Sequence, residues 1–331
     1  YGLSHANATK AFIHASNASW NKTLYDPYVN MLRTTTESMS AILGGVNSLN
    51  TSPYNQAFES PTTFSERIAR NQQLILKGES FFDKVADPAA GSYYIENLTS
   101  ELIHHAWKLF LQVDEKGGYF EAFQDGFIQE RIAKEAQKKD MDIAMRKQSI
   151  LGTNQYPNTS EQITDTQQFR TTIKETGDIE TLKLYRGAGA FEEVRLKTDK
   201  HSINNPQPKV WMFTYGNLAM RKARSQFAGN FFGCAGFEII DNLGFPTIEK
   251  GVSAAKDAKP SIIVICSSDE EYADIAIPIY EALKDHSIIV LAGYPKDLIE
   301  EFKAAGLEHF IHIKSNVLEE LSNYQLLIGI E

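Results

Sequence analysis

Few side chains in this sequence stand in a pattern that performs chemistry unaided. The eight histidines lack the spacing of metal ligands, and His104 and His105 are adjacent, so they point to different parts of a helix surface. No serine or cysteine has the strand–turn–helix context of a hydrolase nucleophile. The run Gly187–Gly189 has neither a preceding strand nor the third glycine of a dinucleotide loop. We therefore expect no catalytic residue and no metal site.

The composition indicates an acidic protein built of folded domains. The 331 residues carry a formal net charge of −9, which disfavours nucleic acid and anionic membranes as partners. Cys234 and Cys266 are the only cysteines, and their apolar surroundings are typical of buried thiols in a reducing cytosol. The sequence shows no signal peptide and no apolar run near the ~20 residues of a membrane span. We expect a cytoplasmic protein of about two domains.

The first 150 or so residues alternate strand and helix patterns, which predicts a parallel sheet. Ala11–Ala15 and Val46–Leu49 are short apolar runs typical of buried strands. Between them Asp26 and Pro27 open a helix, because Asp26 can cap free amides and proline suits the first helical position. Its core-facing stripe is expected to be Val29, Leu32, Thr36, Met39 and Leu43.

Two further helices are predicted in this part. One covers Phe64–Lys77 and stops at Gly78. The other closes at Gly117 and Gly118, and its apolar stripe consists of Leu102, Ile103, Ala106, Leu109, Phe110 and Val113. Only two strands are evident here, whereas a (β/α)₈ barrel needs eight strands and roughly 250 residues.

The connector that follows is polar. Gly152–Gln168 has no hydrophobic period and is expected to be an ordered surface linker. Tyr185–Asp199 contains Arg186, Phe191, Glu192 and Arg195, and the plainest interpretation is a surface helix in which Glu192 pairs with Arg195.

Residues 208–331 show five β/α units. Continuous β-branched runs such as Ile262–Ile265 are typical of strands buried on both faces. The pattern predicts an open, doubly wound sheet of flavodoxin type, whose ligands bind beyond the carboxyl ends of the strands. Strands are expected at Val210–Thr214, Gly236–Ile240, Ser261–Cys266, Ile288–Ala292 and Phe310–Ile313, and helices at Ala219–Cys234, Thr247–Lys256, Glu270–Lys284, Pro295–Ala305 and from Val317 to about Leu326.

The stretch Val85–Glu96, VADPAAGSYYIE, resembles a hallmark of the adenosylcobalamin-dependent acyl-CoA mutases, above all the methylmalonyl-CoA mutase family. Arg70 and Asn71 match a further landmark of that family. The resemblance implies that residues 1–150 are the closing part of a (β/α)₈ TIM barrel, with most of the barrel before Tyr1. It also implies that 151–207 form a linker and 208–331 a degenerate cobalamin-binding-like domain.

The residues that face substrate and corrin in the family's catalytic subunits are altered here. Those subunits carry Arg-x-His-x-Gln at the end of the strand that corresponds to Ala11–Ala15. In this sequence Phe12 replaces the arginine, His14 is kept and Ser16 replaces the glutamine. With its partners gone, His14 is expected to be structural.

The cobalamin positions implied by the resemblance are also degenerate. The family's Asp-x-His-x-x-Gly supplies a cobalt ligand, a carboxylate that orients it and a close backbone approach. Here those places hold Leu218, Met220 and Ala223. The motifs after the third and fourth strands of the sheet are changed as well, to Cys266 and to Ala292 and Gly293 followed by Tyr294. We expect no cobalamin binding, with Phe, Tyr and Met side chains such as Phe227 or Phe231 filling the tunnel.

The resemblance thus implies the family's small, non-catalytic subunit. The segment with Arg186, Phe191, Glu192 and Arg195 resembles one characteristic of small subunits. Such a chain holds no cofactor and forms a heterodimer with a homologous catalytic large subunit, which isomerises methylmalonyl-CoA and succinyl-CoA through adenosylcobalamin radical chemistry. The alternatives are a catalytic subunit that binds cobalamin unconventionally and a free-standing ligand sensor.

Overall fold

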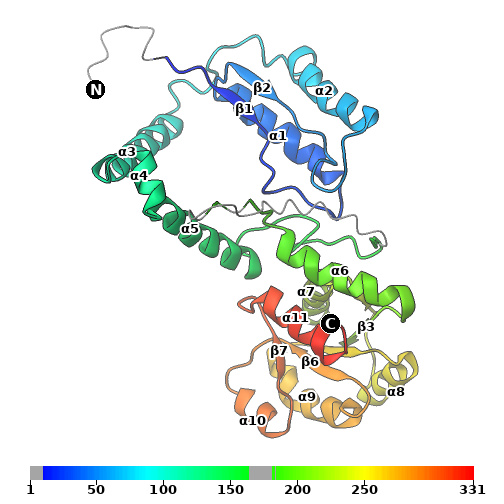
Figure 1. The fold of residues 1–331 in the computed structure, drawn as a ribbon. Coiled ribbons are helices and arrows are strands. Elements are labelled where there is room, and N and C mark those ends of the chain that lie inside the picture. Colours follow the sequence, from blue (N-terminus) through cyan, green and yellow to red (C-terminus); the bar gives the residue numbers. More distant parts are fainter. Residues whose placement is uncertain (1–9, 164–180, 183) are drawn as a thin grey trace. The chain divides into compact units, whose positions relative to one another are not determined.

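The computed structural model describes residues 10–163, 181–182 and 184–331 (Figure 1). These residues fall into two compact units. The first contains the described residues as far as Lys138 and those of 181–186, and the second contains 139–163 and 187–331. The boundary lies within helix α5 (Phe127–Ala144). Helix α6 (Gly189–Asn204) lies in the stretch predicted to be a linker and belongs to the second unit.

The predicted α/β class is confirmed, because both sheets of the described residues are parallel. In the first unit β1 (His14–Ser16) pairs with β2 (Ser48–Asn50). Helix α1 (Val29–Leu43) connects these strands, and α2 (Thr63–Gly78) follows β2. A strand, a helix and a parallel neighbouring strand make one β/α crossover.

The predicted stripe of α1 is wrong, because this helix buries polar residues. Its buried positions are Asn30, Thr34 and Ser38, whereas Leu32 and Leu43 are exposed. The Asn30 side chain bonds the backbone of Thr23 and accepts from the Arg33 guanidinium. Gln72 of α2 donates to the Met31 carbonyl at 2.6 Å and to the Thr34 hydroxyl at 2.9 Å. Helix α1 therefore meets its neighbours through hydrogen bonds, which hydrophobic periodicity does not reveal.

The first unit continues in α3 (Tyr93–Glu115) and α4 (Tyr119–Gln124). Gly117 and Gly118 close α3 as predicted, with φ of 91° and 100°. The helix buries none of its residues, so the predicted apolar stripe lies at the surface of the described structure. Periodicity identified an apolar face, but a face is buried only where another element covers it.

All five predicted strands of the second unit are present. They are β3 (Lys209–Thr214), β4 (Glu238–Ile240), β5 (Ile262–Cys266), β6 (Ile288–Ala292) and β7 (His309–Ile311). The order is β4-β3-β5-β6-β7, all parallel, which is the 2-1-3-4-5 order of flavodoxin-type sheets. Central β5 is buried at every position, in keeping with its unbroken β-branched run.

Helices cover both faces of this sheet. Those after the strands are α7 (Leu218–Gly233), α8 (Ile248–Ala258), α9 (Asp269–Leu283), α10 (Ile299–Ala304) and α11 (Val317–Leu327). Helices α8 and α9 pack against each other and against the sheet, in a core that includes Phe213, Ile263 and Ile265. Helix α7 contacts β3, β4 and β5, and α11 packs on α6 (Figure 1).

Close packing of α8 on the sheet makes Gly251→Ala destabilising. A Cβ at Gly251 would lie 2.4 Å from Cζ of Phe213, a fully buried ring of β3. We expect the free energy of unfolding to fall by about 1–3 kcal/mol, measured by urea unfolding. Gly229→Ala in α7 is the control, because its Cβ meets Ile239 at an ordinary 3.4 Å. Alanine favours a helix by about 1 kcal/mol over glycine, so equal stability of the two variants would contradict this packing.

Candidate functional site

The carboxyl ends of β3, β5 and β6 meet at one edge of the five-stranded sheet. Strands β4 and β5 lie on opposite sides of β3, so the chain leaves β3 and β5 toward opposite faces. Ligands of open α/β sheets bind at this switch point. The structure brings all six predicted cobalamin positions to this edge: Leu218, Met220, Ala223, Cys266, Ala292 and Gly293.

Three of these positions form the exposed start of α7. Leu218 is 66% exposed, Met220 is 38% exposed and Ala223 is exposed too. The Asn217 side chain caps the helix, since its Oδ1 accepts from the amides of Ala219 and Met220, both at 3.1 Å. None of the three side chains offers a charge or an imidazole. The start of α7 therefore presents an apolar surface, and its amides at Ala219 and Met220 are already bonded.

The other three positions are buried beneath Tyr272. Burial, assisted by Asp241, raises the pKa of the Cys266 thiol. The Tyr272 hydroxyl donates to the Ala292 carbonyl at 2.7 Å and accepts from the Ser267 amide at 3.1 Å. A Cβ at Gly293 would lie 3.2 Å from the Tyr272 ring. Tyr272 thus occupies the space between the ends of β5 and β6.

A carboxylate occupies the space between the loops after β3 and β5. Glu271 accepts hydrogen bonds from the Asn217 amide at 2.9 Å, the Ser268 amide at 3.2 Å and the Ser267 hydroxyl. The Ser267 hydroxyl is the main cause that lowers the pKa of Glu271, and the bonds from Ser268 and Asn217 add to it against desolvation. A Cβ at Gly216, whose φ is 74°, would lie 2.3 Å from this carboxylate.

Two arginines of α7 close the same edge. Arg221 donates to the carbonyls of Gly216 at 3.0 Å and Leu243 at 2.9 Å. Arg224 forms an ion pair with Asp269 at 2.9 Å, which joins α7 to α9. The crevice at the switch point is therefore spanned by side chains of this chain, most of them polar.

The prediction that Phe, Tyr and Met side chains such as Phe227 or Phe231 fill this crevice is only partly right. Tyr272 does so, but Phe231 is fully buried toward the far end of α7, in ring contact with Phe227 and Phe232. Neither Phe227 nor Phe231 belongs to the loops after the strands. The Ser268-x-x-Glu271 spacing was the available sequence signal for Glu271, because it is a helix capping box.

His14 has a structural partner in the neighbouring strand. Its Nδ1 lies 2.6 Å from the Ser48 hydroxyl, and the two residues are paired across β1 and β2. Phe12, predicted in a buried strand, is 76% exposed and precedes β1. Ser16 ends that strand. The contact with Ser48 agrees with the structural role predicted for His14, whereas the exposure of His14 was not predicted.

Helix α6 buries much of its surface, so the prediction that it is a surface helix was wrong. Glu192 and Arg195 are each 2% exposed. The Arg195 guanidinium donates to the carbonyls of Asn158 at 2.5 Å and Glu161 at 2.7 Å. Asp199, also buried, accepts from the amide of Ile163. The described part of the predicted surface linker is thereby fixed on α6.

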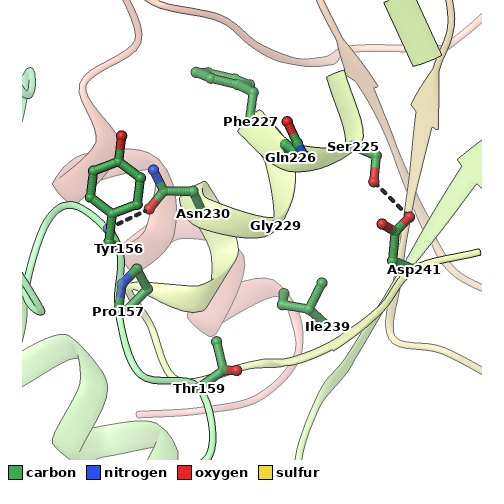
Figure 2. A pocket seen from close by; sticks show the side chains of 10 residues that line it. All are labelled: Tyr156, Pro157, Thr159, Ser225, Gln226, Phe227, Gly229, Asn230, Ile239 and Asp241. Atoms are coloured by element: carbon green, nitrogen blue, oxygen red, sulfur yellow. Dashed lines mark hydrogen bonds between the residues drawn. The ribbon is translucent and has the colours of Figure 1, made fainter. Parts of the chain in front are cut away.

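A groove of about 640 Å³ runs along α7 on the second unit (Figure 2). One wall is held in place because the Tyr156 amide donates to Asn230 Oδ1 at 2.9 Å. At the other end the Ser225 hydroxyl donates to Asp241 at 2.6 Å. None of the predicted cobalamin positions lines it; the lining residues are Tyr156, Pro157, Thr159, Ser225, Gln226, Phe227, Gly229, Asn230, Ile239 and Asp241.

Among the described residues, neither metal binding nor membrane insertion has support. No group of three or more His, Cys, Asp or Glu side chains among them is arranged to hold a metal ion. Within the same residues, no helix has the length and apolar character needed to cross a membrane.

Comparison with known proteins gives the family. The family profile described as methylmalonyl-CoA mutase matches residues 1–202. The chain is 46% identical to the methylmalonyl-CoA mutase small subunit of Porphyromonas gingivalis, over all of this chain and 53% of that protein. It is 34% identical to the probable small subunit of Mycobacterium bovis, over 96% of this chain and 51% of the relative. The chain therefore belongs to the methylmalonyl-CoA mutase family.

The similarity to a large subunit covers less of the chain than the similarity to the small subunits. The methylmalonyl-CoA mutase large subunit of Porphyromonas gingivalis is 38% identical, over 47% of this chain and 22% of the relative. The chain spans about half the length of the small subunits it matches.

The Glu271 contacts make stability depend on pH. The folded protein lowers the pKa of this carboxyl, so its contribution is complete above the ordinary glutamate value of about 4.3 and is lost as the pH falls through the lower folded value. As the pH falls from about 5 to about 3, we expect the free energy of unfolding to decrease less for Glu271→Gln than for the wild type. Urea unfolding across this range measures the slopes. Glu270→Gln, at an exposed neighbour, should keep the wild-type slope; equal slopes in all three proteins would contradict the prediction.

Proposed function

We propose that this chain is part of a non-catalytic small subunit of methylmalonyl-CoA mutase, which supports a homologous catalytic large subunit. The observation that carries the proposal is the edge formed by the loops after β3, β5 and β6. At the positions where the family's cobalamin-binding chains hold a cobalt ligand and its orienting carboxylate, Met220 and Leu218 face solvent.

The residues present do not fit cobalamin. A thioether matches Co(III) poorly compared with imidazole, and Leu218 cannot orient a ligand by hydrogen bonding. The space beside these positions is occupied by the carboxylate of Glu271 and the ring of Tyr272. We derive no catalytic step through a cofactor in this chain, and these contacts also weigh against a catalytic subunit with an unconventional cobalamin mode.

The extent of similarity supports the same assignment. The match to relatives named small subunit extends over 89–100% of this chain, whereas the match to a large subunit extends over 47%. The same organism supplies both a small-subunit and a large-subunit relative. A free-standing sensor is disfavoured, because the family profile matches residues 1–202, all of which precede the five-stranded sheet.

We further propose the architecture that the family implies. The crossover β1-α1-β2, followed by α2, fits adjacent units from the closing part of a TIM barrel. The five-stranded sheet fits a degenerate cobalamin-binding-like domain of flavodoxin type. Cys234 and Cys266 are both free and buried, which supports a cytoplasmic location.

In this proposal the two subunits have different roles. The large subunit binds adenosylcobalamin, which supplies the radical that interconverts methylmalonyl-CoA and succinyl-CoA. This chain contributes a homologous fold whose equivalent crevice is closed by its own side chains. Homologous chains can pair through related surfaces about a pseudo-twofold axis, which gives a heterodimer.

Affinity purification of the native protein that contains this chain tests the partnership. We expect a larger homologue with an intact Asp-x-His-x-x-Gly motif to co-purify in equal amount, and mutase activity to require that partner. The control is the same purification from cells that lack the large subunit. Turnover of methylmalonyl-CoA by the small subunit with adenosylcobalamin alone would overturn the proposal.

A further inference from the structure

The groove along α7 shares none of its lining residues with the crevice at the switch point (Figure 2). Its lining comes from the middle of α7, from β4 and the residue after it, and from residues 156–159. All of these belong to the second unit. Its volume of about 640 Å³ is within the range of sites that hold small molecules, roughly 300–1,000 Å³. The groove is therefore large enough to take a ligand.

One wall of the groove is fixed to α7. The Tyr156 amide donates to Asn230 Oδ1 at 2.9 Å. One turn further along the helix, Gly233 lets the wall approach closely, because a Cβ there would lie 3.0 Å from side-chain atoms of Pro157 and Thr159. A wall that is already in place does not have to be ordered when a ligand binds, which favours affinity.

Tyr156 places an aromatic ring on this wall. The residue is 74% exposed, and its φ of 50° lies in the left-handed region that is costly for a tyrosine. Strained backbone of this kind is concentrated at active sites and ligand clamps. With Pro157, Phe227 and Ile239, Tyr156 gives the groove an apolar and partly aromatic surface.

The other end of the groove carries a carboxylate whose charge is not compensated. Asp241 Oδ1 accepts from the Ser225 hydroxyl at 2.6 Å and from the Asn242 amide at 2.9 Å. Within the described parts of the chain, Asp241 forms no ion pair, and its Oδ2 accepts no hydrogen bond. Both arginines of α7 are bound elsewhere, Arg221 to backbone carbonyls and Arg224 to the carboxylate of α9 described above. The exposed carboxylate is thus free to meet a cation.

Gly229 keeps the floor of the groove open between these two ends. A Cβ at this position would meet Ile239 at 3.4 Å and Met212 at 4.0 Å, which are ordinary contacts. The helix could therefore carry a larger residue here, and that side chain would enter the groove. The absence of a side chain at Gly229 leaves space beside the carboxylate.

We propose that the groove along α7 binds a small organic cation, an amine whose ammonium group meets Asp241 and whose apolar body lies against Tyr156, Phe227 and Ile239. The carboxylate selects a positive charge through a charged hydrogen bond, and the aromatic rings add apolar and cation–π contacts. Asp241 is the only carboxylate in the lining, so the groove does not suit a metal ion that needs several oxygen ligands. The inference concerns only the second unit and does not depend on the subunit role proposed above.

Tryptamine is the probe, because it joins an ammonium group to an aromatic body, and indole-3-propionate is its anionic counterpart. Isothermal titration calorimetry at low ionic strength measures both with the native protein that contains this chain. We expect saturable binding of tryptamine, with a Kd on the order of 1 mM or lower, and binding of indole-3-propionate that is at least about tenfold weaker.

Two variants locate the binding in the groove. Asp241→Asn keeps an oxygen that can accept from Ser225 but removes the charge, and we expect it to weaken tryptamine binding at least about fivefold. Gly229→Leu fills the floor and should weaken binding by at least as much. Asp274→Asn is the matched control, since it removes the same charge from an exposed position of α9, and it should bind as the wild type does.

The inference fails if tryptamine shows no saturable binding to the wild type. It also fails if folded Asp241→Asn binds tryptamine as tightly as the wild type, or if the wild type binds indole-3-propionate equally well. Should Asp241→Asn not fold, the preference of the wild type for the cation and the weaker binding by Gly229→Leu decide the question. Should neither variant fold, the comparison of the two probes with the wild type decides it alone.

Discussion

Arg195→Met is expected to lower the free energy of unfolding of the second unit by about 3 kcal/mol or more. The guanidinium is almost fully buried and donates to the carbonyls of Asn158 and Glu161. Methionine fills a similar volume but leaves those two carbonyls without these donors. It also removes a cation from a helix face that buries the carboxyl groups of Glu192 and Asp199.

Urea unfolding followed by circular dichroism measures this effect. Lys197→Met is the matched control, because Lys197 is exposed on the same helix and the substitution removes the same charge. We expect the control to stay within about 0.5 kcal/mol of the wild type, as surface substitutions usually do. Equal stability of the two variants would show that Arg195 does not hold residues 158–163 against α6.

The second sheet could be predicted from sequence because its signals are local. Ile262–Ile265 is an unbroken β-branched run, and the structure buries all of β5 as such runs require. Each strand is followed by a helix pattern, which forces parallel pairing. The buried face of α1 could not be predicted in this way, because it depends on Gln72, 41 residues beyond Met31, reaching its backbone.

The location of the candidate site could be predicted from the sequence, but the side chains that occupy it could not. The resemblance placed Leu218, Met220 and Ala223 directly after β3, and the structure has them in the first turns of α7, which follows that strand. Glu271 was recognisable from sequence only as a capping residue. Its contact with Asn217 arises because β3 and β5 are neighbours in the sheet, and sequence spacing within one loop does not contain that information.

Restoring the cobalt ligand alone, by Met220→His, is expected to leave cobalamin binding at least about 100-fold weaker than in a cobalamin-binding subunit. The imidazole would have no carboxylate at position 218 to orient it, and Ala223 would still carry a methyl group where the family has glycine. The Glu271 carboxylate and the Tyr272 ring would still occupy the neighbouring crevice. A control substitution, Met220→Gln, changes polarity at the same exposed position without supplying a strong ligand.

The most direct test of the account is an absorbance titration of hydroxocobalamin and adenosylcobalamin with the native protein that contains this chain, separated from its large subunit. We predict that the corrin bands keep their free-solution positions with the wild type and with Met220→His. A homologue with intact Asp-x-His-x-x-Gly serves as positive control. A stoichiometric complex of the wild-type protein, with a Kd on the order of 1 μM, would contradict the central claim that this chain is a mutase subunit without its own cobalamin.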